Sequence, residues 1–80
     1  MVMMMRISDV MQASGNKRWK IYSDVREGLL PPPVKIGKRC AAWPSSEIKE
    51  LIGARIAGKS ESGIKALVAQ LMADRKMGRG

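Results

Sequence analysis

The sequence predicts a small α+β fold, mostly helical, in which two short helices precede a β-hairpin and two longer helices follow it. Three observations predict this order. A cationic helical segment at 17–27 ends at a glycine, and three consecutive prolines follow it. Short segments with an apolar/polar pattern lie on either side of a Gly-Lys turn at 37–38. Beyond the hairpin, the stretches 45–58 and 64–77 repeat apolar residues at helical spacing.

The N-terminal part predicts a short strand from its methionines and then a short helix. The hydroxyl of Ser8 suits the capping position of that helix, and Val10 then faces the interior. Ser14-Gly15-Asn16 predicts a tight turn, in which Asn16 can cap the next helix. Two helices joined by such a turn form a helix-turn-helix, although many other helical hairpins share the pattern.

The second helix, at 17–27, has two faces of different character. Ile21 and Val25 share one face at 100° per residue, and Gly28 ends the helix on the same side. A solvated face usually mixes charges, whereas here the acids fall to one side. The rest of the surface carries an indole, bases and hydroxyl groups, from Trp19, Lys20, Tyr22, Ser23 and Arg26.

The segment after this helix predicts a two-stranded β-wing. Pro31 to Pro33 stop the helix and force an extended path. Val34 to Ile36 alternate as a half-buried strand does, Gly37-Lys38 supply the turn, and Arg39 to Trp43 return as the second strand. We expect the indole of Trp43 in the core, where it fastens the wing to the helices.

The third helix is expected to begin at Pro44-Ser45-Ser46-Glu47, with a capping serine, and to end near Gly58. Its core-facing stripe is Ile48, Leu51, Ile52 and Ile56. The chain then divides into a winged domain at 1–58, a connector at 59–63 and a C-terminal amphipathic helix at 64–77. That last helix needs a partner surface. It either packs on its own domain or pairs with the same helix of another protomer in a homo-oligomer.

Composition restricts the function. Fifteen Lys and Arg against seven Asp and Glu give a formal charge of +8, which suits a polyanionic partner such as nucleic acid or an anionic membrane surface. No apolar run approaches the roughly 18 residues of a membrane span, and no signal peptide is evident, so we expect a cytoplasmic protein. The chain has no His and one Cys, Cys40. We therefore expect no catalytic site, metal, cofactor or small-molecule ligand.

Particular residues also carry a resemblance to a known family. They are the Ser14-Gly15 turn, Arg18, Ile21-Tyr22, Glu27-Gly28, Pro31, Pro33 to Gly37, Arg39, Trp43 and Ser46 to Ile48. With these residues, the stretch from Arg6 to about Gly58 resembles the AlpA-like prophage regulators. Those are small winged helix-turn-helix proteins (MerR/excisionase-like). The chain departs from their pattern at Asn16, Lys17, Trp19, Lys20 and Pro44.

The resemblance implies a phage or prophage protein that binds and bends duplex DNA. Its role would be that of a transcriptional regulator or of a recombination directionality factor (excisionase), with an integrase as the implied protein partner. Since Lys17, Trp19 and Lys20 stand where the family has small hydroxyl residues, its base preference does not transfer to this chain.

The expected DNA contacts fall into three groups. Lys17, Arg18 and Tyr22 hold phosphates, and Trp19, Lys20, Ser23 and Arg26 face the bases of the major groove. On the wing, Lys35, Lys38 and Arg39 meet the adjacent minor groove or backbone. Neutralising about five to seven phosphates predicts a slope of log K against log[salt] near −5 or −6.

Each group has an alternative. Arg18 can form a surface salt bridge, Trp19 can cover the wing or contact a protein, and Lys35 can be an ordinary solvent-facing strand residue. At the level of the whole chain, the alternatives are a basic protein-binding module, such as a phage-encoded inhibitor or anti-repressor, and a membrane-surface protein anchored by 64–72.

Overall fold

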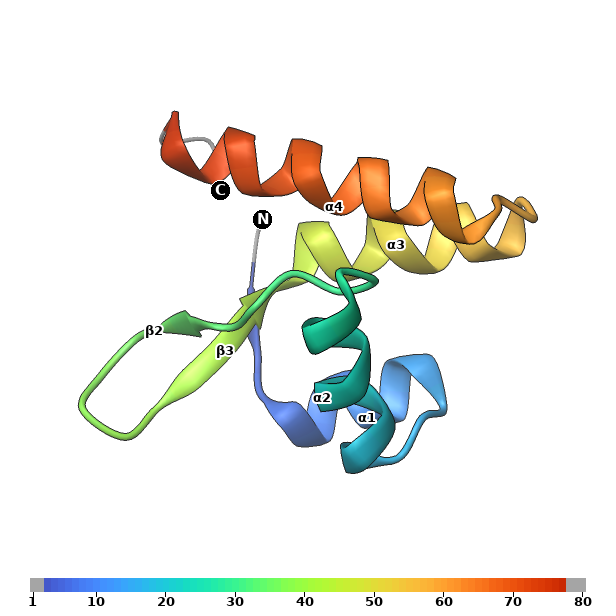
Figure 1. Cartoon of the computed structure of the whole chain (residues 1–80). Coiled ribbons are helices and arrows are strands. Elements are labelled where there is room, and N and C mark those ends of the chain that lie inside the picture. The colour runs from blue at the N-terminus through green and yellow to red at the C-terminus, as the bar shows by residue number, and fades with distance from the viewer. Residues whose placement is uncertain (1–2, 78–80) are drawn as a thin grey trace.

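The computed structural model describes residues 3–77 and confirms a mostly helical α+β fold (Figure 1). A short strand and two short helices come first, a hairpin follows, and two longer helices complete the chain. The elements are β1 (Met4–Met5), α1 (Ile7–Ser14), α2 (Arg18–Glu27), β2 (Val34–Lys35), β3 (Ala41–Pro44), α3 (Ser45–Ile56) and α4 (Glu61–Lys76).

The sheet has three strands, one more than the two-stranded wing expected from the hairpin. β3 lies in the centre, with β1 antiparallel on one side and β2 antiparallel on the other. In the wing, the Ile36 N–H donates to the Cys40 carbonyl at 2.9 Å, so that Gly37, Lys38 and Arg39 form the loop between the strands. The prediction that Arg39 begins the second strand is therefore wrong. The closing hydrogen bond makes this a three-residue connection, and β3 begins two residues later.

Trp43 lies at the centre of the first core cluster and is completely buried, as predicted. It packs with Val10 of α1, Ile21 of α2 and Ile48 of α3. Its indole N–H donates to the carbonyl of Pro31 at 2.7 Å. The wing is thus joined both to the helices and to the proline segment that follows α2.

A second core cluster holds α4 against α3, along which it lies in Figure 1. Ile64, Val68 and Leu71 are buried in it, together with Leu51 and Ala54 of α3. The apolar stripe of the last helix is therefore covered by its own chain. α4 begins at Glu61, and Ser60 caps it by accepting the N–H of Gly63 at 3.3 Å, so the expected connector is helical over its last three residues.

Ile56 contradicts the expected stripe of α3, since it is 82% exposed. Ala54 is buried instead, because α4 covers that side of α3. Successive residues are rotated by about 100° around the helix axis, so Ile56, two positions after Ala54, lies nearly on the opposite side of α3. The docking of α4 thus rotates the buried face of α3 away from Ile56.

The expected helix caps are also wrong at three positions. The N-cap of α1 is Arg6 rather than Ser8, and the carboxylate of Asp9 accepts the Arg6 backbone N–H at 3.0 Å. The N-cap of α2 is Lys17 rather than Asn16, and no side chain caps it. Ser45 lies inside α3, where its hydroxyl accepts the backbone N–H of Met3 at 2.9 Å and so secures β1 to the helix.

Candidate nucleic-acid interface

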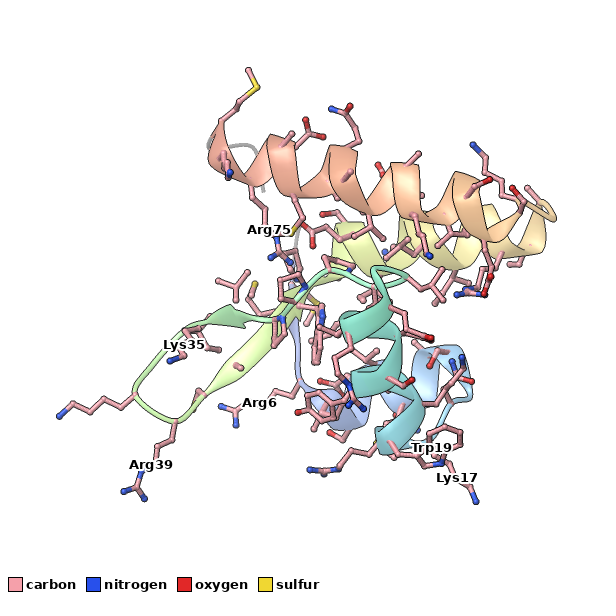
Figure 2. The ribbon with its side chains drawn as sticks, viewed as in Figure 1. Arg6, Lys17, Trp19, Lys35, Arg39 and Arg75 are labelled. Atoms are coloured by element: carbon pink, nitrogen blue, oxygen red, sulfur yellow. The ribbon has the colours of Figure 1, made fainter. Side chains whose placement is uncertain are left out.

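The start of α2 presents two cations and an aromatic ring to solvent. Gly15 ends α1 in the left-handed region, with φ at 75°, and turns the chain into α2. Lys17 and Arg18 follow at the helix N-terminus, and both are exposed. Trp19 is 68% exposed, so its indole covers neither the wing nor the core. Figure 2 shows Lys17 and Trp19 projecting from the end of α2 that points away from α4.

The inward residues of α2 fix the direction of the others. Ile21 is buried and Val25 is half-buried, as the periodicity predicted. Tyr22, which is 44% exposed, and Arg26 are therefore left on the outer surface. Ser23 is half-buried on the same helix. The outer face of α2 accordingly offers an indole, a phenol, a hydroxyl and a guanidinium.

Lys20 differs from the other cations of α2 because it has an acidic partner. Its Nζ lies 2.9 Å from Oδ1 of Asp24, whose side chain is only 8% exposed. This hydrogen bond, together with the negative charge of Asp24, raises the pKa of Lys20 above its usual value. The positive charge of Lys20 is therefore partly balanced by Asp24 within the helix.

The wing adds three exposed cations to the surface. Lys35 lies on β2, and Lys38 and Arg39 lie in the loop between β2 and β3. In Figure 2, Arg39 projects from the wing toward the same side of the molecule as Lys17. Ile21 of α2 and Trp43 of the wing pack in the same buried cluster. This packing fixes the position of the α2 cations relative to the wing cations.

Most of these charges have no acidic partner. Within residues 3–77, only Lys20 and Arg75 have a carboxylate oxygen within 4.0 Å. The alternative of a surface salt bridge at Arg18 is therefore not what the structure shows. Between positions 6 and 44, eight Lys and Arg face three Asp and Glu, whereas between 45 and 77 six face four. Positive charge is concentrated on the part of the chain that contains α2 and the wing.

Arg75 of α4 joins α3 and the proline segment that leads into the wing, and sequence reasoning missed it. Its Nε and Nη2 donate to the two carboxylate oxygens of Glu47 at 2.8 and 2.6 Å, and its Nη1 donates to the carbonyl of Pro32 at 2.9 Å. The Glu47 side chain is 4% exposed. Glu47 lies in the first turn of α3, where an acid already suits the positive end of the helix dipole, and nothing in the sequence pattern linked it to a residue 28 positions away.

Two kinds of arrangement are absent from the described residues. Between residues 3 and 77, no three His, Cys, Asp or Glu side chains come together as metal ligands would. The longest helix of this part, α4, has 16 residues, and none of its helices has the length and apolar character of a membrane span.

Comparison with known proteins assigns the chain to a family. Residues 3–56 match the family model described as prophage CP4-57 regulatory protein (AlpA). The chain belongs to the AlpA family. This confirms the resemblance seen in the sequence, and it covers the elements from β1 to α3, while α4 lies beyond the matched residues.

A phage protein shows how similar the chain is to a known relative in sequence. The AlpA-family chain is 38% identical over 55 residues to the uncharacterized protein ORF88 of Enterobacteria phage P4. The matched stretch covers 69% of this chain and 62% of that protein, which is less than two thirds of the relative's length. No solved structure matches the chain at a significant level.

Proposed function

We propose that this AlpA-family chain is a phage or prophage regulator that binds duplex DNA. In the proposed complex, α2 enters the major groove and the wing meets the adjacent minor groove or backbone. The observation that carries the proposal is the set of exposed cations on α2 and the wing. Apart from Lys20, none of them has a carboxylate partner within the described residues.

The proposed phosphate contacts lie at the start of α2. Lys17 and Arg18 are exposed there, and no side chain caps the helix, so the positive end of the helix dipole lies beside these two cations. Tyr22 adds a hydroxyl group. Cationic side chains and a helix N-terminus together favour a phosphate oxygen.

The proposed base contacts lie farther along the outer face of α2. Trp19, Ser23 and Arg26 are directed into the major groove, where a guanidinium can take guanine by two hydrogen bonds and an apolar ring can contact a thymine methyl group. Lys20 is proposed to contact the same groove but to contribute less to the binding free energy, since its ammonium group is already paired with Asp24. Lys35, Lys38 and Arg39 of the wing are proposed on the neighbouring groove or its phosphates.

The biological role that we propose is regulatory, in accord with the family description. Such a protein acts in the cytoplasm, where the phage DNA lies, either as a transcriptional regulator or as an excisionase that directs an integrase. Assays of promoter activity and of excision, each with and without the chain, distinguish the two roles.

The direct test removes one cation from each part of the interface. Arg18→Ala with Lys38→Ala is expected to weaken binding to a fluorescent duplex by roughly tenfold for each lost phosphate contact at about 0.1 M salt. The matched control is Lys59→Ala with Lys65→Ala, which removes the same charge from exposed positions before and on α4. That control is expected to leave the affinity within about threefold of the wild type.

Equal losses in the two double variants would overturn the proposed interface, because they would show that only the net charge matters. Absence of duplex binding by the wild type at low salt would overturn DNA binding itself. It would favour the alternative of a basic module that binds an acidic protein.

A further inference from the structure

Arg6 is an exposed cation that lies between α1 and the wing. It directly follows β1 and is the N-cap residue of α1. Its Nη2 donates to the sulfur of Cys40 at 3.4 Å, and Cys40 directly precedes β3. Figure 2 places its side chain in the space between the wing, which carries Arg39, and the end of α2 that carries Lys17 and Trp19.

The guanidinium of Arg6 is oriented without being neutralised. Within residues 3–77, it has no carboxylate oxygen within 4.0 Å, although Asp9 is three residues away. The carboxylate of Asp9 instead accepts the backbone N–H of Arg6 at 3.0 Å. A thiol is a weak acceptor, so the contact with Cys40 leaves the charge and most of the five N–H donors available.

The position of Arg6 matters because of the shape of duplex DNA. One sugar-phosphate strand separates a major groove from the adjacent minor groove. A protein that places one element in each of these grooves must straddle that strand. The part of its surface between the two elements then faces phosphates, and in this chain that part carries Arg6.

We propose that Arg6 binds a phosphate of the backbone that passes between α2 and the wing. This inference rests on the proposed function and extends its interface to a residue outside both elements. The guanidinium contributes charge and paired donors to a phosphate, which is the ligand geometry that arginine matches best. The contact is independent of base sequence.

The test compares Arg6→Met, Arg6→Lys and the control Lys65→Ala with the wild type. Arg6→Met keeps the aliphatic stem and the backbone N–H that Asp9 accepts. Anisotropy titrations at several salt concentrations, on two duplexes of unrelated sequence, give an affinity and a salt slope for each variant. Urea unfolding of every variant shows whether the fold is kept.

Arg6→Met is expected to weaken binding to both duplexes by about tenfold at about 0.1 M salt and to make the slope of log K against log[salt] smaller by about one. Arg6→Lys, which keeps the charge, is expected to retain the wild-type slope, and Lys65→Ala to change neither quantity. A folded Arg6→Met variant with the wild-type slope would overturn the assignment of Arg6. If Arg6→Met unfolds, Arg6→Gln takes its place because it also removes the charge, and a folded Arg6→Gln variant with the wild-type slope would overturn the assignment equally. Failure of the wild type to bind either duplex would instead count against the proposed function.

Discussion

Arg75→Met is expected to lower the free energy of unfolding by about 3–5 kcal/mol, because it leaves the carboxylate of Glu47 buried without its partner. The Glu47 side chain is 4% exposed, and both of its oxygens accept hydrogen bonds from Arg75. The variant also frees the carbonyl of Pro32, which Arg75 holds at 2.9 Å. Since a domain of this size has roughly 4–12 kcal/mol of stability, much of the chain should then be unfolded or close to it.

Urea unfolding followed by circular dichroism measures this effect. Arg55→Met is the matched control, because Arg55 is exposed on α3 and has no carboxylate within 4.0 Å among residues 3–77. It is expected to change stability by no more than about 0.5 kcal/mol. Adding Glu47→Met to Arg75→Met removes the unpaired charge, so the double variant should unfold at a higher urea concentration than Arg75→Met alone. Equal midpoints for Arg75→Met and Arg55→Met would show that the pair does not secure the wing.

Trp43→Ala is expected to cost about 3–5 kcal/mol, because it empties the centre of the cluster that joins the wing to α1, α2 and α3. The indole is fully buried and donates to the carbonyl of Pro31 at 2.7 Å. Trp43→Phe keeps most of the packing but leaves that carbonyl without its donor. It should therefore lie between the wild type and Trp43→Ala, at a cost of about 1–3 kcal/mol.

The second tryptophan of the chain is the control for this series. Trp19 is 68% exposed, so Trp19→Ala should leave the urea midpoint nearly unchanged while it weakens duplex binding. Circular dichroism is the suitable signal, because both substitutions alter tryptophan fluorescence directly. A Trp19→Ala variant as unstable as Trp43→Ala would contradict the assignment of these two residues to the interface and the core.

Local chemistry explains which parts of the fold could be predicted from the sequence. Gly15 and Gly28 adopt positive φ at the ends of α1 and α2, as their positions directly after the predicted helical segments indicate. The three prolines and the apolar strand pattern likewise determine where the wing begins. On α2, the inward direction of Ile21 fixes where Trp19 and Arg26 point, which made much of the candidate interface predictable.

Contacts between distant parts of the chain explain the rest. The exposure of Ile56 depends on where α4 docks, and a helical stripe does not specify which surface covers it. The ion pair of Glu47 and Arg75 spans 28 positions and has no periodic signal. Arg6 had no signal either, because its place beside the wing follows from the pairing of β1 with β3.

The salt dependence of duplex binding tests the central proposal most directly. Anisotropy titrations of the wild-type chain with a fluorescent duplex, over a range of about 50 to 300 mM salt, give the slope of log K against log[salt]. Contacts by the α2 and wing cations with about five to seven phosphates predict a slope near −5 or −6. An affinity that barely changes over this range, or no measurable binding at the lowest salt concentration, would contradict the proposal that this chain grips duplex DNA through α2 and the wing.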